Sequence, residues 1–147
     1  APHRGEVLRA PRDVVIFDDS YNASPSALEQ ALRVVAADRS GRRRVAWLGE
    51  MLELGAASTA LHRECGAAVA HAGIACLVTV GGPPARALGE AAVAAGVPAA
   101  GVSHCATSDE AAGLAASLVR PGDLVLVKGS RGTKMERVVE GLQGERT

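Results

Sequence analysis

Short apolar runs alternate along the chain with longer segments in which apolar residues recur every three or four positions. The apolar runs are typical of buried strands, and they predict strands at 14–17, 45–48, 76–80, 100–104 and 124–127. The periodic segments predict helices at 25–37, 58–72, 85–95, 108–119 and 134–142. A further segment at 5–9 is predicted to be an extra edge strand. The alternation predicts an α/β fold: a Rossmann-like, open, mostly parallel sheet of about six strands with helices on both faces.

The composition limits the function classes. A length of 147 residues fits one domain with its own core, and 48% of the residues are apolar although only 2% are aromatic. The formal net charge is zero, so no global field favours nucleic acid or a membrane surface. No apolar run approaches the ~20 residues that a membrane-spanning helix needs. Arg42-Arg43-Arg44 forms the one dense basic run, and we expect it to be a solvated loop.

The cysteines indicate neither disulfides nor a metal. Cys65, Cys76 and Cys105 are odd in number and show no CxxC spacing. We therefore predict three buried thiols in a reducing cytosol, and no metal site.

Three predicted strands end in unusually polar segments, at 18–24, 49–55 and 128–132. The carboxyl ends of parallel strands lie at one edge of a sheet, and ligands bind at that edge in open α/β folds. The three segments are therefore predicted to meet at one site.

The first polar segment has the chemistry of a nucleotide-site wall. Asp18 and Asp19 are adjacent, so their side chains should point to opposite sides of the strand. A carboxylate there can bind ribose hydroxyls, the Tyr21 ring can stack on a base, and Asn22 can both donate and accept hydrogen bonds. The alternative is an Asp-rich turn that only caps the following helix at Ser24.

The other two segments differ in how much they indicate. Lys128, Ser130 and Arg131 lie among glycines before a helix, an arrangement that suits a binding site for phosphate or carboxylate. The GxxxxGK[ST] pattern of a P-loop is absent. A plain strand-exit turn is the alternative. Glu50 and Glu53 are expected to be solvated charges. The four histidines show no triad or metal-ligand spacing, and no GxGxxG follows a strand.

Taken together, the segments resemble the C-terminal domain of the Mur ligases. Residues 18–25 read DDSYNASP where the family has DDSYNANP, and residues 49–55 read GEMLELG where it has GDMLELG, with His62 downstream. Residues 127–136 contain VKGSR and ME, as the family does. The order of the motifs is also that of the family. Glu50 and His62 match the pattern without an assigned role.

The resemblance implies site residues. Pro2–Glu6 resembles the arginine-containing segment that leads into this domain in the family. The family resemblance implies that Arg4 contacts the ATP phosphates and that Asp19 contacts the ribose. It also implies that Tyr21 and Asn22 line the adenine pocket. It assigns contacts with the incoming dipeptide or the acyl phosphate to Lys128, Ser130 and Arg131.

The resemblance also implies a reaction in bacterial peptidoglycan synthesis. It is greatest to the cytoplasmic members that add D-alanyl-D-alanine to UDP-N-acetylmuramoyl-tripeptide. In the family, ATP phosphorylates a carboxylate of the precursor, the incoming amine attacks the acyl phosphate, and phosphate leaves. Of the three domains, the first binds the uridine nucleotide, the central one carries the P-loop and the Mg²⁺ ligands, and the third closes over ATP.

The sequence contains no P-loop and none of the central-domain Mg²⁺ ligands. Residues 1–147 are therefore expected to be a single C-terminal domain excised from a three-domain enzyme, inactive alone and without catalytic or metal-binding residues of its own. Its partners would be ATP, the two substrates and the missing N-terminal and central domains. The alternatives are the C-terminal domain of another Mur-type ligase, or a stand-alone binding module. The diaminopimelate- or lysine-adding ligase is disfavoured because its DNPR segment is missing after residues 78–80.

Overall fold

A six-stranded sheet runs through the centre of the molecule. The structure is a computed structural model and describes residues 2–21 and 23–144. The spatial order of the strands is β1-β2-β6-β3-β4-β5. Their bounds are β1 Glu6–Ala10, β2 Val14–Asp19, β3 Arg44–Gly49, β4 Cys76–Val80, β5 Val102–Cys105 and β6 Leu124–Lys128. β1 pairs antiparallel with β2, and every other pair of neighbours is parallel, which confirms the predicted fold class and the extra edge strand.

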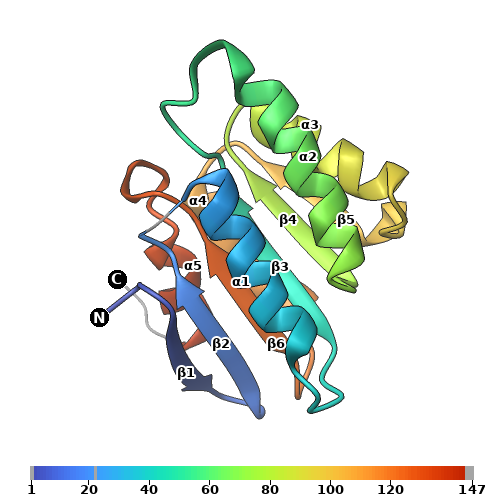
Figure 1. The fold of residues 1–147 in the computed structure, drawn as a ribbon. Coiled ribbons are helices and arrows are strands. Elements are labelled where there is room, and N and C mark those ends of the chain that lie inside the picture. Colours follow the sequence, from blue (N-terminus) through green and yellow to red (C-terminus); the bar gives the residue numbers. More distant parts are fainter. Residues whose placement is uncertain (1, 22, 145–147) are drawn as a thin grey trace.

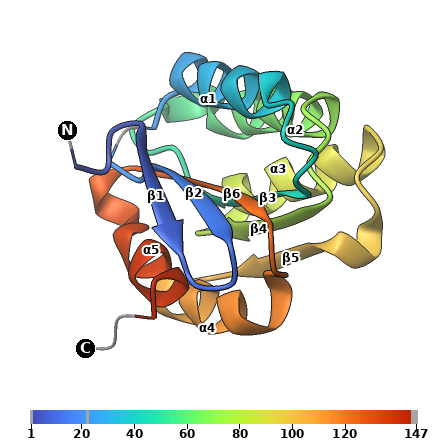
Figure 2. The same ribbon diagram turned by 90° about the horizontal axis from the view of Figure 1, so that it is seen from below.

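Five helices cover the two faces of the sheet (Figures 1 and 2). On one face lie α1 (Pro25–Ala37), α2 (Ser58–His71) and α3 (Pro83–Ala94), and on the other lie α4 (Ser108–Leu118) and α5 (Glu136–Leu142). Short 3-10 turns occupy Gly55–Ala57, Ala99–Gly101 and Arg131–Thr133. None of the helices in the described part of the chain is long and apolar enough to cross a membrane.

Local sequence signals explain α1. The Ser24 side chain accepts a hydrogen bond from the amide of Ala27 at 3.2 Å and so caps the helix, while Pro25 takes the first helical position. Leu28 and Leu32 lie one turn apart on the buried face. The helix therefore begins and ends where the pattern predicted.

The alternation of side chains in β3 builds two cores. Ala46 and Leu48 pack with α1, α2 and α3, whereas Val45 and Trp47 pack with α4 and α5. The indole nitrogen of Trp47 donates to the carbonyl of Ala111 at 3.0 Å, so the one polar atom of this buried ring is satisfied. Burial on both faces is the reason that the central strands appear in the sequence as continuous apolar runs.

Most element boundaries differ from the predictions by one or two residues, and two of these differences have a cause in 3-10 turns. β5 begins at Val102 because residues 99–101 form a 3-10 turn, and α5 begins at Glu136 because residues 131–133 form another. Both turns depend on close tertiary packing. At Gly101, for example, a Cβ atom would lie 2.5 Å from the carbonyl oxygen of Ala75.

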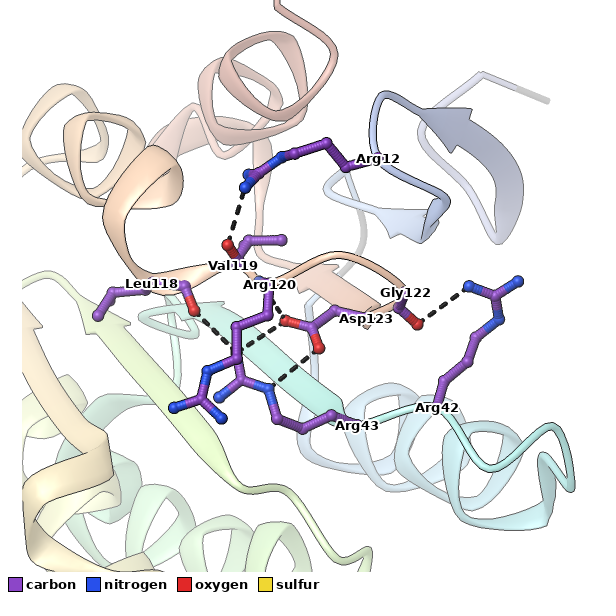
Figure 3. A network of polar contacts seen from close by, with 8 residues as sticks. All are labelled: Arg12, Arg42, Arg43, Leu118, Val119, Arg120, Gly122 and Asp123. Carbon is purple, nitrogen blue, oxygen red and sulfur yellow. Dashed lines mark hydrogen bonds and ion pairs between the residues drawn. The ribbon is translucent and has the colours of Figure 1, made fainter.

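The arginine triplet is not a solvated loop, and that expectation was wrong. All three guanidinium groups donate to backbone carbonyls at the edge of the sheet where the parallel strands begin, here called the amino edge; Figure 3 shows bonds of Arg42 and Arg43. The acceptors are Asp13 and Gly122 for Arg42, Leu118 for Arg43, and Ala36, Asp38 and Ala72 for Arg44. Because a guanidinium carries five donors, one short segment satisfies the carbonyls of several helix ends and turns.

Candidate functional site

The polar strand exits meet at the carboxyl edge, where the parallel strands end. β2 ends at Asp19, β6 at Lys128 and β3 at Gly49, and β6 lies between the other two strands. Figure 1 shows the orange-red loop after β6 and the green loop after β3 at the same upper end of the sheet. The convergence predicted from the sequence is therefore present.

Asp19 and Lys128 form an ion pair at this edge. They are register partners on the neighbouring strands β2 and β6, and Lys128 Nζ lies 2.8 Å from Asp19 Oδ2, at angles outside hydrogen-bond geometry. The Lys128 side chain is 2% exposed and that of Asp19 is 13% exposed. Burial lowers the pKa of the Lys128 ammonium, and the neighbouring Asp19 carboxylate opposes that shift.

Asp18 points to the other side of β2, as predicted, and binds His3. The Asp18 side chain is fully buried; its Oδ2 lies 2.6 Å from His3 Nδ1, and its Oδ1 accepts from the amide of Ser20 at 3.1 Å. Two backbone bonds fasten the same segment, from Gly5 to Asp18 and from Tyr21 to His3. The residues around Arg4 are therefore attached to the end of β2.

Tyr21 connects the two predicted sets of site residues. Its ring lies against the His3 ring, with centroids 4.5 Å apart, and the Arg131 guanidinium lies 5.1 Å from its centroid. This cation–π contact joins the β2–α1 loop to the β6–α5 loop. One nucleotide candidate and one substrate candidate are thus in direct contact.

A cavity of about 260 Å³ brings Arg4 and Asp19 together. It lies between the end of β2 and α1, and its lining also includes Phe17 and Val34. The combination of a cation, a carboxylate and an apolar wall suits a ligand with a charged group, hydroxyl groups and a flat ring.

The buried side-chain atoms that lack hydrogen bonds gather at the same edge. Among the described residues these atoms are Ser20 Oγ, Lys128 Nζ, Ser130 Oγ and Glu136 Oε2. Ser20 directly follows β2, and the other three residues lie between the end of β6 and the start of α5. Such atoms are rare in folded proteins, so their clustering favours this edge as a ligand site.

The loop after β3 is held by His62. The amide of Met51 donates to His62 Nε2 at 2.9 Å, and His62 Nδ1 lies 2.7 Å from the carbonyl oxygen of Ser58. Because Nε2 accepts, the imidazole is neutral and carries its proton on Nδ1. His62 is fully buried, so it is part of the structure beneath the site.

Glu50 was expected to be a solvated charge, and that expectation was wrong. Its Oε1 accepts a hydrogen bond from the amide of Gly82 at 2.8 Å, and a Cβ atom on Gly81 would lie 2.8 Å from Glu50 Cβ. This contact fixes the β4–α3 turn to the end of β3. Glu50 and Gly81 line a second cavity of about 310 Å³. Residues 106–108 at the start of α4 and residues 132–134 also line it.

The glycine after Lys128 serves the chain's own packing. A Cβ atom on Gly129 would lie 2.3 Å from Met135 Cγ, so the chain itself fills the space beside this glycine. Gly49 is similar, because a Cβ atom there would lie 2.8 Å from Thr133 Oγ1. The glycines at the ends of β3 and β6 therefore let residues 133–135 fold back over the sheet.

The structure thus brings most of the predicted site residues to one edge. Arg4 and Asp19 share a cavity and Tyr21 meets Arg131, whereas Lys128 is buried against Asp19. Asn22 lies outside the described residues. His3 was missed, because its partner Asp18 is 15 positions away and no spacing rule connects the two.

Metal binding finds no support in side-chain geometry. Within residues 2–21 and 23–144, no three His, Cys, Asp or Glu side chains come close enough to hold a metal ion.

The fold and the site define a class. This is an α/β domain whose carboxyl edge carries a carboxylate–lysine pair, an aromatic ring under a guanidinium, and a separate arginine. The family model "Mur ligase, glutamate ligase domain" matches residues 3–131. The chain belongs to this family, which confirms the resemblance in its motifs.

Named relatives agree with that assignment. The chain is 32% identical to UDP-N-acetylmuramoyl-tripeptide--D-alanyl-D-alanine ligase of Bacillus subtilis over 95% of its own length, and 34% identical to that of Escherichia coli over 97%. It spans 30% of the length of each of these two relatives.

Solved structures show the same fold. The MurF ligase of Thermotoga maritima in complex with ADP matches with a TM-score of 0.78 at 28% identity, and a MurF of Acinetobacter baumannii with 0.83 at 27%. Each match covers 99% of this chain and 31% of the other. A domain of a ligase from Haemophilus ducreyi, 15% identical with a TM-score of 0.60, shows this fold in a separate chain of which 99% is covered.

Proposed function

We propose that this chain is the nucleotide-closing and substrate-positioning domain of an ATP-dependent ligase that adds D-alanyl-D-alanine to UDP-N-acetylmuramoyl-tripeptide. The observation that carries the proposal is the meeting of three family motifs at one sheet edge, where Arg4 and Asp19 line one cavity. The two substrates are those in the names of the relatives. Because the chain spans 30% of the length of these relatives, we assign the other steps of the reaction to domains outside it.

On the nucleotide side, the cavity beside α1 would take the ribose and the phosphates. The Asp19 carboxylate can accept hydrogen bonds from ribose hydroxyls, and the Arg4 guanidinium can bind phosphate oxygens in a bidentate manner. Tyr21 offers its ring to the adenine, with Asn22 next to it in the sequence.

On the substrate side, the β6–α5 loop would meet the incoming dipeptide or the acyl phosphate. Arg131 is exposed and Ser130 carries a hydroxyl without a hydrogen bond, so both groups have capacity for a ligand. The 310 Å³ cavity lies on the other side of β6 from the nucleotide cavity, and Glu50 gives it a carboxylate that suits an amine. A dipeptide there would approach the reaction centre from the side opposite to ATP.

ATP supplies the phosphoryl group that activates the precursor carboxylate, and the associated Mg²⁺ neutralises phosphate charge. The orphaned atoms Ser20 Oγ and Ser130 Oγ and the Arg4–Asp19 cavity fit a nucleotide. We leave the metal ligands and the phosphate-binding P-loop to the central domain, so the isolated chain should bind ATP weakly and catalyse nothing. With its three buried thiols, it suits the bacterial cytoplasm.

Titration of the ¹⁵N-labelled chain with ATP tests the proposal. We expect amide shifts at Arg4, Gly5, Asp19 and Tyr21, and a weaker but measurable affinity for ATP in the variant D19N. The matched control is D13N, at the amino edge, which should titrate as the wild type does. Shifts that avoid the carboxyl edge would overturn the nucleotide assignment. Phosphate release by the chain alone that depends on D-alanyl-D-alanine would overturn the prediction that it is inactive.

A further inference from the structure

Asp19 and Lys128 have different access to the nucleotide cavity. Asp19 lines it, whereas Lys128 is not among the described residues that line either cavity at this edge. The Lys128 ammonium lies 2.8 Å from Asp19 Oδ2, and 2% of the lysine side chain is exposed. The Asp19 carboxylate therefore lies between the ammonium and the cavity. The carboxylate keeps its second oxygen, Oδ1, for a ligand hydroxyl.

We propose that Lys128 is a positioning residue: it holds the Asp19 carboxylate toward the cavity and does not itself touch nucleotide or dipeptide. This inference rests on the proposed function, because it needs a nucleotide in the cavity that Asp19 lines. It also changes the role that the family resemblance assigned to Lys128.

The surroundings of the pair favour this role. The two residues are the last of their strands and are register partners, so the backbone sets their side chains next to each other on one face of the sheet. Asp19 is the counter-charge that the structure gives the buried ammonium. A lysine that left Asp19 to reach a phosphate would abandon this pair and leave the carboxylate partly buried and unpaired, which is costly.

A direct phosphate ligand and a positioning residue make different predictions for nucleotides of different length. If Lys128 works through Asp19, its loss should weaken adenosine and ATP by the same factor, since both carry the ribose. If Lys128 touches phosphate, its loss should weaken ATP and leave adenosine unchanged.

The test is a double-variant cycle in this chain, with K128M, D19N and the pair combined, each titrated with adenosine and with ATP. We expect K128M to weaken both ligands about fivefold or more. We expect D19N and the combined variant to bind equally, because Lys128 has nothing left to position. R39M is the matched control, since Arg39 is an exposed cation just after α1, at the amino edge. It should bind as the wild type does.

Three outcomes would overturn the inference. They are a loss confined to ATP, a further loss of ATP affinity on going from D19N to the combined variant, and unchanged binding in K128M. The comparison of D19N with the combined variant, which carries neither charge, decides the matter even if K128M does not fold. If the wild-type chain shows no shifts at this edge with either ligand, the proposed function itself fails and the inference falls with it.

Discussion

Arg43 and Asp123 form a bidentate ion pair at the amino edge of the sheet, at the opposite end from the candidate site (Figure 3). Arg43 Nε lies 3.0 Å from Asp123 Oδ1, and Nη2 lies 2.7 Å from Oδ2. The Asp123 carboxylate also accepts from the amide of Arg120, and Arg43 donates to the carbonyl of Leu118. The carboxylate raises the pKa of Arg43, against the effect of burial. The pair thus connects the beginnings of β3 and β6 to the end of α4.

Loss of this pair should destabilise the fold without affecting the site. The Asp123 side chain is 2% exposed, so D123N leaves a partly buried guanidinium without its counter-charge. We expect the free energy of unfolding to fall by about 3 kcal/mol. Urea denaturation measures the change. D13N is the control, because Asp13 pairs with Arg42 while 71% of its side chain is exposed, and it should cost less than about 1 kcal/mol. Equal losses in the two variants would contradict this account.

Replacement of His62 should loosen the loop after β3. H62A leaves the amide of Met51 without its acceptor in a buried place, and we expect a loss of about 2 kcal/mol. Hydrogen exchange at the Met51 amide should speed up more than exchange in the β3 strand. The control is H71A, since His71 is exposed at the end of the same helix. The role of His62 would need revision if Met51 remained protected in H62A.

His104 should make the stability depend on pH in mild acid. Burial, and then the charge of Arg86, lower the pKa of His104 from its ordinary value of 6.5. As the pH falls through 6.5, the unfolded chain therefore takes up this proton before the folded chain does, and stability falls. At higher pH both states are neutral at this residue and the penalty disappears.

The variant H104N isolates that contribution. The neutral imidazole bonds to Thr79 Oγ1 at 2.8 Å, so the variant should be less stable than the wild type at pH 8. The difference between the two should shrink as urea denaturation is repeated toward pH 5. S103A, on the same strand, supplies a non-titrating control whose difference from the wild type should stay constant. A gap in H104N that is independent of pH would rule out the proton linkage.

The cysteines should resist alkylation in the folded chain. Burial first, and then the charges of Glu29 and Glu64, raise the pKa of Cys65 to about 12. Burial likewise raises the pKa of Cys76 and Cys105. Since the thiolate is the nucleophile, mass spectrometry after iodoacetamide treatment at neutral pH should find all three unmodified. All three should react once the chain is unfolded, and fast native labelling of Cys65 would contradict its burial.

Much of the fold could be predicted because its signals are local. The Ser24–Pro25 start of α1 lies within one helical turn, and the buried strands appear as continuous apolar runs. An extra edge strand at the position of β1 was also expected, whereas its antiparallel direction was not. The shifted starts of β5 and α5 were not, since both depend on 3-10 turns packed against residues far away in the sequence.

The sequence by itself determined the α/β class, the family and the edge at which the polar segments meet, because residue order, periodicity and motifs carry this information. Only the tertiary structure decided which polar groups meet. It paired Asp18 with His3 and Asp19 with Lys128, and it used residues 42–44 to satisfy carbonyls of helix ends and turns. These contacts join residues from 6 to 109 positions apart. They form because a buried charge or carbonyl needs a partner in space, and spacing along the chain does not identify that partner.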